Sequence, residues 1–286
     1  MSDIYSTTTE DFSKFTQIPI TVVKDHAALN QRVADEFVTL LREKTEKDDM
    51  LTVILPVGPL DYTYFAAVVN REGLSCRNLI AYNMDEYLDE NDELVSVDHP
   101  LSFRKYMEES FWSRLSDDAR PLPENIRMPD PHAPEKTTAF FESIGGADIV
   151  WGGLGATGHF AFNDPPEPNE DQSAEAVRGS RTRCLTICRE SMTQMAIGGT
   201  NGYVEIIPKR AITLGMYELA MSKKVHMTFM RSWHAGVWRR AFFGPVTPTC
   251  PGSFLQEHSN IEIMLSEIAA QPPLVNVTQA IGEEEE

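Results

Sequence analysis

Residues 51–69 read LTVILPVGPLDYTYFAAVV, and this stretch decides the fold class. It begins with a largely apolar run of strand length, residues 51–56, which ends in a turn containing glycine and proline. Apolar residues at helical spacing then follow over residues 62–69. A buried strand that turns through glycine into a helix is the repeating unit of an α/β protein with a parallel sheet.

The same kind of apolar run recurs along the chain, with helical patterns between several of the runs. The further strand-like runs cover residues 79–82, 147–151, 211–214, 225–230 and 261–265. Helical patterns cover residues 102–115 and, from an N-cap at Asp25, residues 26–47. We therefore predict an α/β fold with a Rossmann-like, mainly parallel sheet and helices on both faces. In such folds ligands bind beyond the carboxyl ends of the strands.

Neither a linker rich in proline, glycine or serine nor an internal repeat divides the 286 residues. We predict a single α/β domain over residues 21–270, preceded by an irregular N-terminal segment, residues 1–20. The acidic residues 271–286 are expected to form a disordered tail.

Composition narrows the classes of protein that fit. Hydrophobic residues make up 42% and charged residues 24%, the balance of an ordinary soluble globular protein. No apolar run reaches the roughly 18 residues of a membrane span, and the polar N-terminus does not resemble a secretory signal. Four irregularly spaced cysteines suit a reducing compartment, so we predict a cytoplasmic protein. A formal charge of −18 argues against a nucleic-acid partner, and we expect a small-molecule one.

The most informative segment is GGLGATGHFAFNDP, residues 152–165, which follows a predicted strand. Its glycines allow a ligand to approach the backbone closely. His159, with Asp164 five residues later, is typical of a proton-transfer pair. From the residues alone, a purely structural histidine is an equal alternative.

A second candidate site follows the run 79–82, where the chain reads NMDEY over residues 83–87. Two adjacent carboxylates at a strand end, Asp85 and Glu86, can supply a general base, because burial and a like-charged neighbour raise a carboxylate pKa. Spacing alone favours a solvated acidic loop.

Two further segments offer groups for an anionic ligand. The turn at Gly58 leads into a helix, whose N-terminus can bind phosphate; a structural turn explains it equally well. Arg181 and Arg183 lie close in sequence and suit a phosphate or carboxylate, although a subunit contact or surface ion pairs would also use them. Weaker candidates of the same kind are Ser232, His234, Arg239 and Arg240.

In their order along the chain, these segments resemble the glucosamine-6-phosphate deaminases, which convert an aldose amino-sugar phosphate into a ketose phosphate and ammonia. The matching strings lie at residues 83–87, 99–100, 152–165, 180–183, 208–209 and 211–215, and the resemblance extends from about residue 51 to 265. It implies a deaminase or isomerase that needs no metal and no redox cofactor. It also implies a sugar or sugar phosphate as partner and allows a homo-oligomer.

The resemblance implies roles residue by residue. Asp85 matches the base that moves a proton between C1 and C2 of the opened sugar, and His159 matches the histidine that opens the ring. Asp164 stands where the family has a glutamate that orients this histidine. The implied substrate-binding residues are Gly58, Glu86, Gly153, Gly155, Thr157, Gly158, Asn163, Arg181 and Arg183.

Three departures from the family pattern bear on the substrate. Thr157 replaces an aspartate, and the turn over residues 57–61 lacks the family's hydroxyls. Met195 and His234 align approximately with an arginine and a lysine that contact phosphate. We therefore predict a divergent active site and a substrate that need not carry the usual 6-phosphate. The alternatives are a catalytically silent sugar-binding or regulatory homologue and, less favoured, a hydrolase like the related 6-phosphogluconolactonases.

Overall fold

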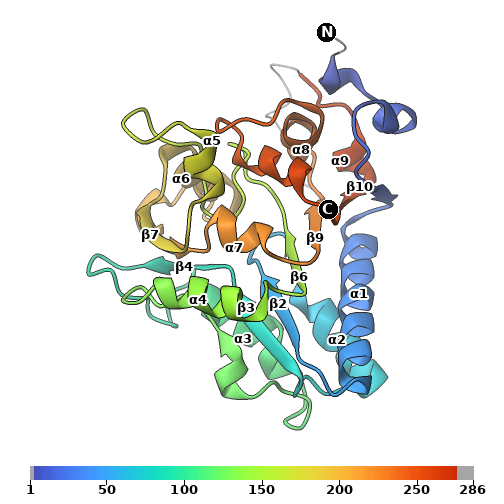
Figure 1. The fold of residues 1–286 in the computed structure, drawn as a ribbon, viewed down its shortest axis with the longest axis vertical. Coiled ribbons are helices and arrows are strands. Elements are labelled where there is room, and N and C mark those ends of the chain that lie inside the picture. Colours follow the sequence, from blue (N-terminus) through green and yellow to red (C-terminus); the bar gives the residue numbers. More distant parts are fainter. Residues whose placement is uncertain (1–2, 276–286) are drawn as a thin grey trace.

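A parallel sheet of seven strands forms the centre of the structure, a computed structural model that describes residues 3–275 (Figure 1). In spatial order the strands are β1 (Ile20–Val23), β10 (Ile261–Ser266), β9 (Val225–Phe229), β6 (Ile149–Gly152), β2 (Leu51–Leu55), β3 (Leu79–Asn83) and β5 (Ile126–Arg127). β2 and β9 are buried along their whole length, as expected of strands covered on both faces. The predicted fold class is confirmed.

Helices cover both faces of this sheet and enclose two separate hydrophobic clusters. One face packs against α1 (His26–Glu46), α2 (Tyr62–Glu72) and α3 (Phe103–Ser110). The other packs against α4 (Glu135–Ile144), α7 (Met216–Ala220) and α8 (His234–Phe243), while α9 (Glu267–Ala270) follows β10. As predicted, the carboxylate of Asp25 caps α1 by accepting the amide proton of Ala28 at 2.9 Å.

A second, antiparallel sheet of three strands stands beside the main one. It consists of β4 (Asp85–Leu88), β8 (Arg210–Thr213) and β7 (Arg183–Thr186), with β8 in the middle. Our assignment of residues 211–214 to the parallel sheet is therefore wrong. β8 is almost completely buried, and burial alone does not tell which of two sheets a strand joins. The short helices α5 (Ala174–Arg178) and α6 (Arg189–Gly198) lie on the same side of the molecule in Figure 1.

The strand order places a topological switch between β2 and β6. From β2 the chain proceeds outward through β3 to β5, then returns to form β6 on the opposite side of β2. Loops that leave two such neighbouring strands diverge and open a crevice at the carboxyl edge of the sheet. The loops after β2 and β6 carry several of the predicted site residues.

The N-terminal residues form short turns that pack on the domain. Before β1 the chain forms 3₁₀ helices at Ile4–Ser6 and Thr9–Lys14, and the Phe12 ring lies 5.1 Å from that of Trp238. Further 3₁₀ helices span Trp112–Arg114, Pro123–Asn125, Val204–Ile206 and Pro251–Glu257. From residue 276 onward, the predicted acidic tail lies outside the described residues.

Arg239 has a structural role rather than the ligand contact suggested by its sequence context. Its side chain is fully buried, and its two terminal nitrogens donate to four backbone carbonyls, those of Thr7, Ala235, Ala270 and Gln271. Replacing Arg239 with methionine removes these donors and leaves buried carbonyls unpaired. We expect a loss of about 3 kcal/mol or more in the free energy of unfolding, measured by urea denaturation.

The matched control is Arg32→Met, which removes an exposed arginine from α1. We expect this change to stay within about 0.5 kcal/mol. Equal effects of the two substitutions would contradict the role given to Arg239.

Candidate active site

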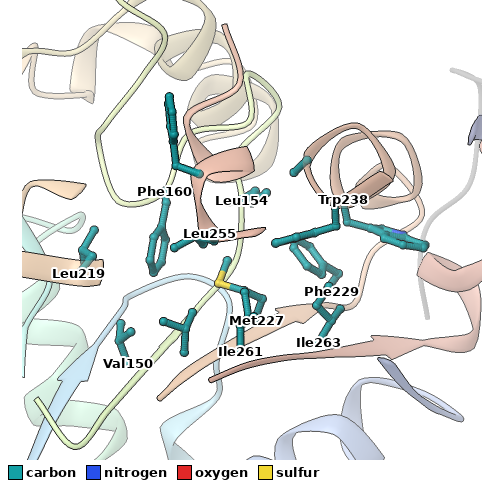
Figure 2. Close-up of a cluster of buried hydrophobic side chains, with 14 of the residues drawn as sticks. Val150, Leu154, Phe160, Leu219, Met227, Phe229, Trp238, Leu255, Ile261 and Ile263 are labelled. Atoms are coloured by element: carbon teal, nitrogen blue, oxygen red, sulfur yellow. The ribbon is translucent and has the colours of Figure 1, made fainter. Parts of the chain in front are cut away.

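The loop that follows β6 is fixed to the sheet by Phe160. This ring is fully buried, and Figure 2 shows it with Leu154 above Met227 and Val150 of the sheet. A Cβ on Gly152 would lie 2.9 Å from Cζ of Phe160 and still closer to Cε2, so only glycine permits this packing. The rest of the loop is thereby held over the carboxyl ends of β6 and β9.

Gly158 allows the loop to turn back on itself. It has a φ of +87°, a conformation that favours glycine, and its amide donates to the Gly155 carbonyl at 2.8 Å. A side chain there would also meet Cys250 and Arg240. Arg240 in turn donates to the Thr157 carbonyl, which fixes the residue before the turn.

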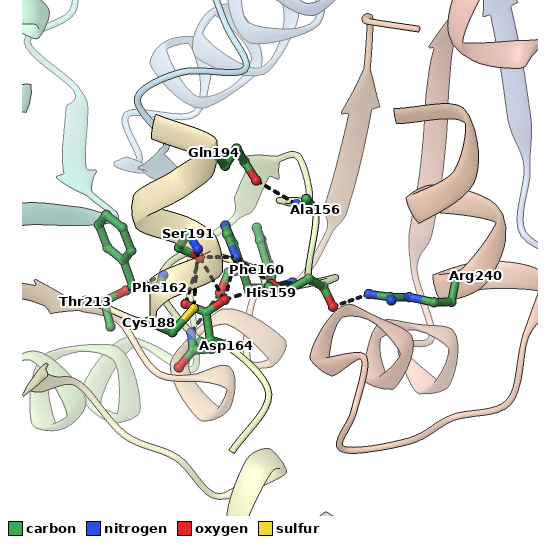
Figure 3. A network of polar contacts seen from close by, with 12 residues as sticks. Ala156, His159, Phe160, Phe162, Asp164, Cys188, Ser191, Gln194, Thr213 and Arg240 are labelled. Carbon is green, nitrogen blue, oxygen red and sulfur yellow. Dashed lines mark hydrogen bonds and ion pairs between the residues drawn. The ribbon is translucent and has the colours of Figure 1, made fainter. Parts of the chain in front are cut away.

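His159 and Asp164 form the predicted pair (Figure 3). The Nδ1 atom of His159 lies 2.8 Å from Oδ1 of Asp164, and both side chains are largely buried. Thr157 joins them, because its hydroxyl lies 2.8 Å from the same carboxylate oxygen. Burial alone would raise the pKa of Asp164, but the hydrogen bonds and charge of His159, together with Thr157, outweigh it and lower this pKa. Asp164 is therefore an ionised acceptor.

The His159 ring lies directly against the backbone of Gly155. A Cβ at Gly155 would stand 2.7 Å from Nδ1 of His159 and closer still to Cε1 and Nε2. With Nδ1 directed at Asp164, Nε2 is the ring nitrogen left for a ligand. Gly155 therefore contributes to the site by the space it leaves for the imidazole.

Asp85 begins β4 and is 7% exposed. Burial, and secondarily the charge of Glu86, raise the pKa of Asp85 to about 8. A carboxyl group with such a pKa can both accept and donate a proton near neutral pH. Our reading of this segment as a solvated acidic loop, favoured on spacing alone, is wrong.

The small sheet brings Asp85 toward the His159 loop. Asp85 pairs with Thr213 of β8, which pairs on its other side with Arg183 of β7, so the three side chains share one face. The Thr213 hydroxyl accepts the amide proton of Phe162 at 3.1 Å. The segment between His159 and Asp164 is thus bonded to the residue directly opposite Asp85.

Glu86 points to the opposite face of β4 and caps a helix. Its fully buried carboxylate accepts bonds from the Ser102 hydroxyl and from the amides of Phe103 and Arg104, at 2.9–3.1 Å. These contacts satisfy the first amides of α3. We therefore leave Glu86 out of the site that we propose.

The two arginines of the 180–183 segment are separated. Arg181 is exposed, pairs with Glu142 at 3.1 Å and covers the Tyr217 ring. Arg183 is half-buried and donates to Oδ1 of Asn163 at 2.8 Å, next to Asp164. No carboxylate pairs with Arg183 in the part of the chain that the structure describes, and burial lowers its pKa. Of the two, only Arg183 remains in the candidate site.

The turn after β2 lies against the β6 loop at the topological switch. A Cβ on Gly153 would stand 3.3 Å from Cβ of Pro59, so the two loops meet there. Gly58 has a φ of +119°, which explains a glycine at this position without a ligand. The carboxylate of Asp61 accepts bonds from the amide and hydroxyl of Thr63, at 2.9 and 2.7 Å, and so caps α2.

Two positions compared above with phosphate contacts have other partners. His234 accepts the amide protons of Met230 and Arg231 on Nδ1, and burial lowers its pKa to about 3, so it is neutral. The Met195 sulfur accepts the Tyr87 hydroxyl.

Two residues of α6 at the site were not predicted. Ser191 contacts both His159 and Asp164, and Gln194 accepts the amide proton of Ala156 at 2.7 Å (Figure 3). Both lie in a segment, residues 189–198, that carries no recognisable motif.

Among residues 3–275, one group of side chains has metal-ligand geometry, and it lies near the amino end of β9. The ligand atoms of Glu36, His226 and Glu262 lie within 4.8 Å of one another. The ammonium of Lys224 already contacts both carboxylates, at 2.6 and 2.7 Å. This lysine supplies the positive charge that a metal ion would bring.

Comparison with known proteins identifies the family. No model of a known protein family matches the chain. A glucosamine-6-phosphate deaminase of Rhodopirellula baltica is 30% identical over 261 residues, which are 88% of this chain and 95% of that protein. The chain belongs to the glucosamine-6-phosphate deaminase family. Another member, from Shouchella clausii, is 27% identical over 257 residues, 87% of this chain and 94% of that protein.

Solved structures agree with this assignment at the level of the fold. A monomeric glucosamine-6-phosphate deaminase of the NagB superfamily aligns with a TM-score of 0.75 and 23% identity, over 88% of this chain and 99% of that one. A 6-phosphogluconolactonase from Trypanosoma cruzi aligns with a TM-score of 0.61 and 16% identity, over 89% and 96%. Within residues 3–275 of this family member, no helix is long and apolar enough to cross a bilayer.

Proposed function

We propose that this chain catalyses the deaminating isomerisation of an amino sugar phosphate or a related amino sugar, from aldose to ketose with release of ammonia. The observation that carries the proposal is the buried carboxylate of Asp85, bonded through its strand to the loop that holds the His159–Asp164 pair. Family membership supplies the reaction class.

Each of the three side chains has a chemical role in this proposal. Asp85 takes the proton from C2 of the opened sugar and returns it to C1, and a pKa of about 8 suits both steps. His159 transfers a proton to and from the ring oxygen through Nε2, while Asp164 holds the opposite nitrogen. Moving this proton leaves an imine at C2, to which a water molecule adds; the C–N bond then breaks, so that ammonia leaves and the ketose forms.

We propose further that a 6-phosphate contributes little to substrate binding. Asp61 places a negative charge at the start of α2, where a phosphate would otherwise meet free amides. His234 is neutral and already engaged, and Met195 carries no charge. The chemistry at these three places supports an anchor formed by the sugar itself.

Purified protein incubated with glucosamine and galactosamine, each with and without 6-phosphate, tests both statements. We expect ammonia and ketose to form in equal amounts. The phosphate should change kcat/KM by less than about tenfold, equivalent to about 1.4 kcal/mol of binding. A preference for the phosphorylated sugar of a thousandfold would overturn the second statement and leave the first.

The other readings of the sequence make different predictions in the same assay. Ligand-induced stabilisation without turnover of any amino sugar would indicate a silent binding protein and refute the proposed activity. With 6-phosphogluconolactone added to the panel, its hydrolysis in the absence of amino-sugar turnover would indicate the lactonase reaction. The variant Asp85→Asn, tested in parallel, excludes turnover by a contaminant.

A further inference from the structure

A hydroxyl group from α6 reaches the centre of the His159–Asp164 pair. Ser191 is the third residue of α6, and only 2% of it is exposed. Its Oγ lies 2.9 and 3.0 Å from the two carboxylate oxygens of Asp164 and 3.0 Å from Nδ1 of His159. Figure 3 shows Ser191 next to both side chains.

The available protons determine the direction of these bonds. Asp164 is ionised and only accepts, so the single hydroxyl proton of Ser191 goes to it. The hydroxyl of Thr157 also donates to Asp164, while its oxygen accepts the amide proton of His159 at 3.2 Å. Nδ1 of His159 must then carry a proton itself, which it donates to Oδ1 of Asp164. The two hydroxyls and the carboxylate together place a proton on Nδ1, which leaves Nε2 as the nitrogen that can exchange a proton with a ligand.

Ser191 holds the side of Asp164 that Thr157 and His159 do not reach. These two residues contact Oδ1, whereas Ser191 also contacts Oδ2 at 3.0 Å. Thr157 and His159 hold only one oxygen of the carboxylate, and the Ser191 hydroxyl, whose single proton is shared between Oδ1 and Oδ2, further restricts rotation about the Cβ–Cγ bond. The orientation of the imidazole therefore depends on a residue of α6.

Two contacts fix the position of α6 next to the glycine loop. The side-chain oxygen of Gln194 accepts the Ala156 amide proton at 2.7 Å, one residue before Thr157. The Cys188 sulfur accepts the Ser191 amide proton at 3.4 Å and caps the helix. These contacts bring the Ser191 hydroxyl to a defined place.

We infer that Ser191 is a positioning residue, which fixes the tautomer and orientation of His159 through Asp164. The expected effect of Ser191 on turnover rests on the proposed function, whereas its effect on the His159 ring does not. The tautomer of the ring can be measured without substrate.

The test compares Ser191→Ala with two variants. Ser191→Thr keeps the hydroxyl, and Thr193→Ala removes an exposed hydroxyl of the same helix, whose one partner among residues 3–275 is the Arg189 carbonyl. We expect Ser191→Ala to lower kcat about 10- to 100-fold, the effect of one hydrogen bond to a charged group, with KM within about twofold. Ser191→Thr should recover most of the lost activity, and Thr193→Ala should match the parent.

Nitrogen-15 NMR of the histidine rings provides a readout without substrate. With His159→Gln used to assign the signals, the parent should show a single tautomer protonated at Nδ1, and Ser191→Ala a mixture. A single unchanged tautomer, or an unchanged kcat in an active enzyme, would overturn the inference. If the parent protein is inactive while the ring signals change as expected, the positioning role stands and the proposed function fails.

Discussion

Replacing Asp85 with asparagine is expected to lower turnover by about 10²- to 10⁴-fold, because it removes the group that moves the proton between C1 and C2. The same change should stabilise the fold at alkaline pH. The pKa of Asp85 is about 8 in the folded protein, against about 3.9 for an unperturbed aspartate. The unfolded chain therefore releases this proton from about pH 4 upward, whereas the folded chain retains it until about pH 8.

The sign of the pH dependence follows from that difference. Between about pH 4 and 8 the unfolded state is progressively favoured, and above pH 8 the full cost of burying the charge is present. Asparagine has no proton to lose. The melting temperature of Asp85→Asn should therefore exceed that of the parent by several degrees at pH 9, by less at pH 6 and not at all below about pH 4.

Glu90→Gln provides the matched control, since it removes one negative charge from an exposed residue of the same segment. We expect neither its activity nor its melting temperature to depart much from those of the parent. An Asp85→Asn protein with parental activity, or a stability gain that is the same at every pH, would contradict the assignment.

The parent's kcat/KM should rise with pH through about 8 as Asp85 ionises.

The five inner strands of the parallel sheet were predictable because they are largely apolar, whereas the edge strands β1 and β5, which are not buried, were missed. Runs such as residues 51–56 and 225–230 owe this composition to burial on both faces, so they stand out in the sequence. The small sheet could not be predicted, because its strand β4 lacks this apolar composition. β4 begins with two carboxylates, and nothing near Glu86 in the sequence reveals that the start of α3 satisfies it.

In the site, too, contacts between residues close in sequence were predictable and contacts between distant residues were not. His159 and Asp164 are five residues apart in a glycine loop, and their contact was predicted from that spacing. Ser191 lies 32 residues from His159 and arrives only because α6 is seated on the loop. Arg181 and Arg183 look equivalent in the sequence, yet Glu142 of α4 holds Arg181 at the surface.

Replacing Gly155 with alanine is expected to lower kcat by at least about 100-fold while the fold remains intact. The new methyl group would occupy the space of the His159 ring, standing 2.7 Å from Nδ1 and closer to Cε1 and Nε2. The backbone at Gly155 does not have the positive φ that excludes alanine, so the ring must move instead. A displacement of about 1 Å is enough to cost a hundredfold in rate. Steady-state kinetics together with thermal melting will measure both effects.

Gly236→Ala is the control for this substitution, because a Cβ there meets nothing within 4 Å and alanine favours the α8 helix. It should leave turnover unchanged and slightly raise the melting temperature.

Combining Gly155→Ala with Ser191→Ala separates two mechanisms. If both act by displacing the same imidazole, the double variant should lose much less activity than the product of the two single losses. Strictly multiplicative losses would show that Gly155 and Ser191 act on different steps, and parental activity in Gly155→Ala would show that the observed ring position is not the catalytic one.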